Sequence, residues 1–157
     1  MGHHAKHSGK SAPKPDPRAA NVDRLNALLA GELAAVATYK LALDHLESQT
    51  HTRTGLESCL QSHQQRVALL RAAIGERGGM PAAGGDAWAS IAEMAETELH
   101  DKAAILALEE REDHELADYR AAVGSVDATL RPLVELQLLP KQVHSLHTIS
   151  ELRKLLH

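Results

Sequence analysis

Glutamate and tyrosine recur with the same spacing in two segments that are predicted to be helical. Glu32 is followed by Tyr39, and Glu112 by Tyr119, seven residues later in each case. Seven residues turn an α-helix through about 700°, so each pair lies on one face, about 20° apart and two turns along. Apolar residues occupy the same faces. Both glutamates are therefore expected to point into a core.

A histidine has the same kind of position in the segment between them. His63 continues an apolar stripe that contains Leu56, Leu60, Val67, Leu70 and Ile74. In the last helical segment the corresponding position is held by Gln142, with His144 close by. Ionisable groups facing a helical core are costly to bury unless they are paired, hydrogen-bonded or bound to metal.

Two kinds of buried site fit these residues. Inward-facing carboxylates and imidazoles build di-metal sites in helical bundles, and they suit Fe, Mn and Zn. The candidate ligands are Glu32, His63, Glu112, Gln142 and His144, supported by Tyr39 and Tyr119. The alternative is a metal-free cluster, with Glu32 bonded to Tyr119 or His63 and Glu112 to Tyr39 or Gln142. The Glu-x-x-His motifs of di-metal bundles are missing, and both alternatives stay open.

The metal-free alternative predicts how substitutions of the two glutamates affect stability. If no metal is bound, replacing Glu32 or Glu112 by Gln is expected to be neutral or stabilising near pH 7. A neutral amide costs less free energy to bury than an anion.

Helical periodicity governs the chain from Asn21 onward. It predicts long helices over about 22–48, 52–77, 101–124 and 128 to the C-terminus, with a short helix around Trp88. Pro140 is expected to kink the last helix near residues 136–140, because proline cannot donate a helical hydrogen bond. Four long helices with short turns predict an all-α, antiparallel four-helix bundle, with the short helix in the central crossover.

The chain contains an internal repeat. Residues 31–43 match residues 111–123 at an offset of 80, and the second and fourth helices match at an offset of 79. Two helix pairs that share nearly one offset indicate a duplicated helical hairpin. The shared Glu-x6-Tyr motif is the strongest part of the match.

Composition narrows the classes of protein. The chain has 157 residues, one cysteine, 2% aromatic residues and a net charge of -4. Residues 1–20 are rich in His, Lys and Pro and carry +3, so they are expected to form a disordered tail before one domain over 21–157. The remaining -7 disfavours nucleic-acid binding. The absence of a long apolar run predicts no membrane span and a cytoplasmic protein, and homo-oligomerisation stays open.

Residues 22–152, approximately, resemble a bacterial ferritin-like domain family of unknown function. The resemblance is carried by the segments LNALLAGELAAVATYKLAL, LEEREDHELADYRAAV and LRPLVELQLLPKQ and by the GGMP loop before Trp88. The resemblance implies a ferritin-like four-helix bundle and, by analogy with that superfamily, iron or other metal binding. Glu32, His63 and Glu112 take positions like those of di-metal ligands. The alternative function is a non-catalytic bundle, in stress response or as an interaction module, whose polar cluster is structural.

Overall fold

The computed structural model describes residues 16–46 and 50–156, and in these ranges all regular structure is helical. The elements are α1 (Pro17–His45), α2 (Thr50–Glu76), α3 (Ala89–Thr97), α4 (Asp101–Ser125), the π-helical η1 (Leu133–Leu138) and α5 (Leu139–Leu155). The predicted all-α class is confirmed. Within the described ranges, no helix is both long enough and apolar enough to cross a lipid bilayer.

α1 begins earlier than the apolar stripe predicts. Pro17 opens the helix, and the Asp16 carboxylate accepts a hydrogen bond from the Arg18 backbone N–H at 3.0 Å. A capping aspartate followed by proline is a strong helix start, which a search for apolar periodicity does not register. Residues 17–20, expected in the tail, are therefore helical, whereas residues 1–15 of that predicted tail lie outside the described part.

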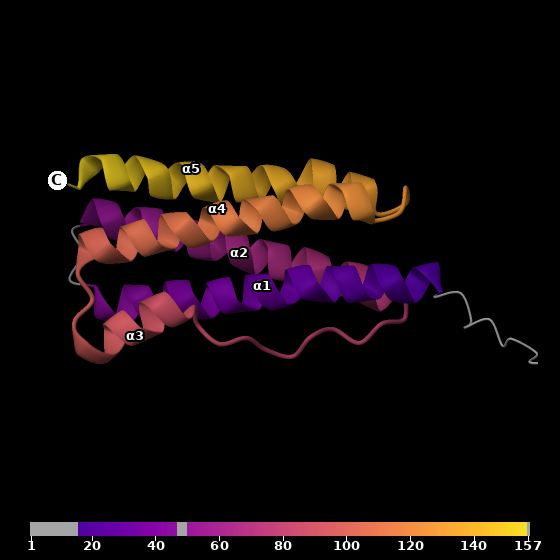
Figure 1. Cartoon of the computed structure of the whole chain (residues 1–157), viewed down its shortest axis with the longest axis horizontal. Coiled ribbons are helices and arrows are strands. Elements are labelled where there is room, and N and C mark those ends of the chain that lie inside the picture. The colour runs from indigo at the N-terminus through magenta and orange to yellow at the C-terminus, as the bar shows by residue number, and fades with distance from the viewer. Residues whose placement is uncertain (1–15, 47–49, 157) are drawn as a thin grey trace, which may run out of the picture.

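The long helices form two pairs joined by a crossover (Figure 1). α1 packs along α2, and α4 packs along the continuous η1–α5 segment. Between the pairs, the chain returns beside α1 to reach the short α3, so that α2 and α4 run in the same direction. The predicted short helix in the crossover is confirmed at Ala89–Thr97.

The crossover is attached to α1 along its length. Gly78, at φ +69°, turns the chain away from the end of α2, a conformation that favours glycine. Asn26 then donates to the Met80 carbonyl at 2.9 Å and accepts from the Ala82 N–H at 2.8 Å. Further on, the Trp88 N–H donates to the Thr38 hydroxyl at 2.7 Å. These bonds fix the path of a segment that has no regular structure of its own.

The last helix widens where Pro140 was expected to distort it. The Leu139 N–H donates to the Val134 carbonyl, five residues back, as in a π-helix. Pro140 has no N–H and its ring would press on the carbonyl four residues earlier in a regular α-helix, so a wider turn before it relieves both problems. The helix continues through this segment to Leu155.

Two apolar clusters fill the space between the helices. One lies around Tyr39, Trp88, Ile91 and Ile105, and the other around Leu25, Leu70, Ile74 and Leu130. Along α1 they are separated by Glu32, which is fully buried. The core is therefore apolar toward both ends and polar in the middle.

Candidate functional site

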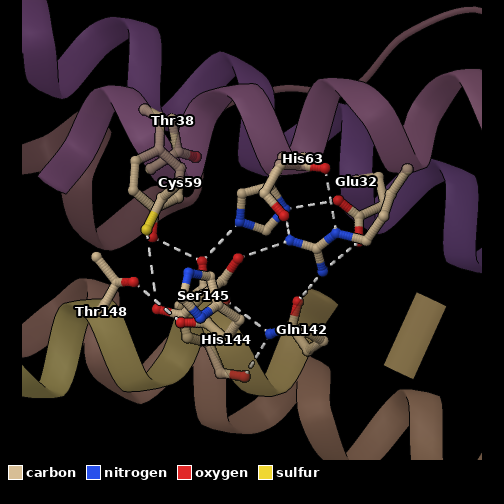
Figure 2. Close-up of polar contacts among 12 residues, drawn as sticks. Glu32, Thr38, Cys59, His63, Gln142, His144, Ser145 and Thr148 are labelled. Carbon is tan, nitrogen blue, oxygen red and sulfur yellow. Dashed lines mark hydrogen bonds and ion pairs between the residues drawn. The ribbon is translucent and has the colours of Figure 1, made fainter. Parts of the chain in front are cut away.

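Each long helical segment contributes one fully buried polar residue to a layer in the middle of the bundle. They are Glu32 from α1, His63 from α2, Glu112 from α4 and Gln142 from α5, all with an exposed fraction of 0%. Figure 2 shows Glu32, His63 and Gln142 converging between the helices. The sequence prediction that these four face the core is confirmed, and we call this layer and its contacts the polar centre.

His63 bridges the two buried glutamates. Its Nδ1 lies 2.6 Å from Glu32 Oε2, and its Nε2 lies 2.7 Å from Glu112 Oε1. A neutral imidazole has one N–H, so donating to both carboxylates requires the imidazolium form. Burial lowers the pKa of His63, but the charges of Glu112 and Glu32 outweigh it and raise the pKa to about 9. His63 is therefore a buried cation at neutral pH, and the two carboxylates offset its repulsion from Arg66, whose Nη2 lies 3.0 Å from His63 Nδ1.

The two tyrosines connect the two hairpins crosswise. Tyr39 donates to Glu112 Oε1 at 2.6 Å, and Tyr119 donates to Glu32 Oε1 at 2.5 Å. Burial and the adjacent carboxylates raise the pKa of both phenols well above the ordinary value, so both remain donors. The Glu-x6-Tyr repeat thus places each tyrosine on the glutamate of the other hairpin.

Arg66 is a second buried cation, and the sequence analysis did not find it. Its side chain is fully buried, with Nη1 3.0 Å from Glu32 Oε1. It also donates to the Gln142 side-chain carbonyl and, at 2.9 Å, to the Ser145 hydroxyl. Gln142 in turn donates to Glu112 Oε2 at 2.7 Å, so one chain of hydrogen bonds links the two carboxylates through Arg66 and Gln142.

Glu115 is the third buried carboxyl of the polar centre and was also missed. One ligand atom from each of Glu32, His63 and Glu115 lies within 4.8 Å of the other two. Burial, followed by the charge of Glu32, raises the pKa of Glu115 to about 8, so it is mostly protonated at pH 7. The charges of the centre then balance, with two anions, Glu32 and Glu112, against His63 and Arg66.

The missed residues share a spacing. Arg66 follows His63 by three residues, Glu115 follows Glu112 by three, and Ser145 follows Gln142 by three. Residues three apart are neighbours on a helix surface, so each pair presents two polar groups to the same space. A search for polar residues at i and i+3 around the predicted inward positions would have found all three.

His144 does not belong to the polar centre. It is exposed on α5, because two residues turn a helix by about 200° and so place it away from the inward-facing Gln142. The prediction that His144 is a ligand is therefore wrong, because it is a surface residue.

Cys59 is buried at the edge of the polar centre, and burial raises the pKa of its thiol to about 12.

The donor set does not fit a di-metal site. Such a site takes one glutamate from each of two helices and a Glu-x-x-His pair from each of the other two. Here Glu32 and Glu112 are present, but the pairs on α2 and α5 are His63-x-x-Arg66 and Gln142-x-x-Ser145. The Arg66 guanidinium bonds Glu32 directly, so a metal ion at Glu32 would have to displace a cation that is already bound there.

Within the part of the chain that the structure describes, the hydrogen bonds of the polar centre satisfy Glu32, Glu112, His63, Arg66 and Gln142, whereas Glu115 has no hydrogen-bond partner. The buried side-chain nitrogen and oxygen atoms without a partner are Trp88 Nε1 and Arg111 Nε, and both lie outside the polar centre.

Comparison of the chain with protein-family models, curated proteins and solved structures finds no match. The assignment of function therefore rests on the chemistry of the polar centre.

Proposed function

We propose that the protein is a ferritin-like helical bundle that works without a resident metal, as a non-catalytic module. Support for the ferritin-like assignment comes from the two hairpins, the crossover between them and the inward pair Glu32 and Glu112. In this proposal the polar centre has a structural role. It fixes which helices pair and in which register, a role attested for buried polar groups.

The observation that carries this proposal is the contact of Arg66 with Glu32. A guanidinium and an imidazolium supply positive charge to the buried carboxylates, as metal ions do in di-metal bundles. With Arg66 and His63 in place, Glu32 and Glu112 have their counter-charges within the chain. Ferroxidase chemistry and iron storage are therefore not part of the proposed function.

A second candidate function has an observation of its own. Glu32, His63 and Glu115 offer one ligand atom each within 4.8 Å, which is close enough for one divalent ion such as Fe, Mn or Zn. Binding would require His63 and Glu115 to release their protons to solvent and Arg66 to leave Glu32. The first candidate needs neither change.

Metal content and thermal unfolding distinguish the two. The chain used is full length, with His3, His4 and His7 replaced by Ala to exclude metal binding by the N-terminal histidines. We expect far less than one metal ion per chain, and the same melting temperature with and without Fe(II), Mn(II) or Zn(II). A bound ion at about 100-fold excess over its Kd would stabilise the fold by about 2.7 kcal/mol.

The matched variants are Glu115→Gln and Asp118→Asn, which remove a buried and an exposed carboxylate from the same helix. A stoichiometric metal whose stabilising effect is lost in Glu115→Gln and kept in Asp118→Asn would contradict the metal-free proposal and establish the single-ion site.

A further inference from the structure

A groove runs between α1 and α4 beside the polar centre. Its volume is about 320 Å³. Ala27, Leu28, Ala121 and Ala122 supply small apolar walls, and Glu115 reaches it from the core. Small residues on two neighbouring helices explain why the groove exists, but they say nothing about what it binds. That information comes from Glu115.

Glu115 is a buried carboxyl that has no cation of its own. Its residue is 5% exposed. Among the described residues it forms no hydrogen bond and no ion pair within 4.0 Å, and a His63 nitrogen lies within 4.8 Å of one of its oxygens. Glu32 and Glu112, by contrast, are matched by Arg66 and His63. A buried carboxyl without partners is costly, and such groups are found where a ligand completes the hydrogen bonding.

Glycine at position 31 leaves the groove open next to this carboxyl. A Cβ on Gly31 would lie 3.0 Å from Glu115 Oε1, closer than ordinary van der Waals contact. Glycine inside a helix costs about 1 kcal/mol relative to alanine. The chain accepts that cost at a point of α1 where a Cβ would lie 3.0 Å from Glu115 Oε1.

Charge decides the kind of ligand and its orientation. Asp118 adds a second carboxylate to the lining, and Arg24 supplies a cation. Arg24 lies seven residues before Gly31, which is about 10 Å along α1. A positive group is therefore favoured near Glu115 and disfavoured at the Arg24 end, while the walls between them accept an apolar body.

From this arrangement we propose that the groove binds a small organic cation, a primary ammonium on a short apolar body, with the ammonium donating to the Glu115 carboxylate. The apolar walls favour an organic ammonium over a hydrated metal ion, because a metal ion gains nothing from contact with alanine and leucine. This ligand site is separate from the structural role proposed for Glu32, Glu112, His63 and Arg66.

Three probes of one shape test the proposal: benzylamine, benzyl alcohol and benzoate, titrated into the full-length protein in the presence of EDTA. Backbone amide chemical shifts report where each probe binds. We expect benzylamine to bind with a Kd on the order of 1 mM, as suits a ligand of so few atoms. Its shifts should map to residues 24–31 and 115–125, and the alcohol and the anion should bind at least about tenfold more weakly.

The variants separate this site from general attraction of cations. Glu115 is mostly protonated in the empty groove at pH 7, and a bound ammonium favours its ionised form. Glu115→Gln should therefore weaken benzylamine binding about tenfold, because glutamine cannot ionise to form the charge-assisted hydrogen bond. Gly31→Ala should weaken it by placing a methyl group about 3.0 Å from Glu115 Oε1, while the carboxyl itself is retained. Asp118→Asn removes an equal charge from an exposed position and should change the Kd less than about threefold.

Several outcomes overturn the proposal. They are equal binding of benzyl alcohol, unchanged affinity in Glu115→Gln, shifts that map to another face, or no binding of benzylamine. None of them bears on metal content, so failure here is distinguishable from failure of the metal-free function.

Discussion

Three buried glutamates differ in what they face. Glu32 contacts both Arg66 and His63, Glu112 contacts His63 and Gln142, and Glu115 contacts no cation closely. The same substitution to glutamine is therefore expected to have opposite effects on stability at these positions. At Glu32 and Glu112 it leaves buried cations without counter-charge, whereas at Glu115 it removes a carboxyl that is itself costly to bury.

Glu32→Gln and Glu112→Gln are expected to destabilise the fold by about 3 kcal/mol each at pH 7, the usual cost of breaking a buried ion pair. Glu115→Gln is the matched control and should be neutral or stabilising. Urea unfolding of the three variants measures the difference. Equal stability of all three would show that Arg66 and His63 do not depend on these carboxylates.

The contacts of Arg66 and His63 reverse the expectation that the sequence alone supports. Without a metal, the sequence predicts that glutamine at position 32 or 112 is tolerated, because a neutral amide costs less free energy to bury than an anion. Glu32, His63, Glu112 and Gln142 could be predicted because they lie on apolar stripes. Arg66 flanks its stripe, and periodicity cannot tell whether a flanking arginine turns inward or toward solvent.

Stability should fall as the pH rises from about 5 to 9. The pKa of His63 is raised from its ordinary 6.5 to about 9, so its stabilising effect is complete below 6.5 and lost through pH 9. The pKa of Glu115 is raised from 4.5 to about 8, so folding is penalised increasingly between these values. The His63 contribution alone is on the order of 3 kcal/mol.

Urea unfolding at pH 5, 7 and 9 tests this dependence. Glu115→Gln should make the curve flat between about pH 5 and 6.5, where only Glu115 titrates, and keep the loss between about pH 6.5 and 9, which His63 causes. A stability that is constant over this range, or that rises with pH, would mean that His63 is neutral in the folded protein.

The π-helical segment η1 sets the rotation of α5. Val134 and Leu138 within it are fully buried, and Gln142 after it reaches the polar centre. The wider turn of η1 allows Val134 and Leu138 within it and Gln142 after it to face inward. The sequence predicts a disturbance here from Pro140, and the structure shows that it takes the form of a wider turn rather than a break. Periodicity predicts the helices themselves well, because each has a sustained apolar stripe.

Deleting Leu136 should destabilise the fold by roughly 3 kcal/mol or more, since it turns α5 by about 100° relative to the residues before it and moves Gln142 out of the centre. Leu136 is 71% exposed, so Leu136→Ala should change stability by no more than about 0.5 kcal/mol. Denaturant midpoints compare the two. A deletion as mild as the alanine variant would mean that the rotation of α5 is not set by η1.

The crossover loop holds the two hairpins in one arrangement. It lies against α1 so closely that a Cβ on Gly85 would come within 2.9 Å of the Ala34 backbone nitrogen. At the neighbouring Gly84, a Cβ would meet no atom within 4 Å. The sequence places the loop correctly from its Gly and Pro residues, but its contact with α1 depends on the fold.

Gly85→Ala is expected to destabilise the protein by about 1–3 kcal/mol, because backbone rather than a flexible side chain must move. Gly84→Ala should be nearly neutral, and it controls for the general effect of losing a glycine. Thermal unfolding together with amide exchange in α1 gives the comparison. Faster exchange around Ala34 is expected in Gly85→Ala alone, and equal behaviour of the two variants would contradict close packing of the loop.

The crossed Tyr–Glu bonds have a consequence for the symmetry of the molecule. Because Tyr39 serves Glu112 and Tyr119 serves Glu32, two identical hairpins related by a twofold axis would satisfy both bonds at once. The two tyrosine–glutamate bonds are thus related by pseudo-twofold symmetry within one chain. Because both hairpins lie in one chain, their sequences can differ, so that one carries His63 between the two glutamates while the other carries Gln142 at the matching position. The asymmetry of the centre is something that a symmetric pair of hairpins could not encode.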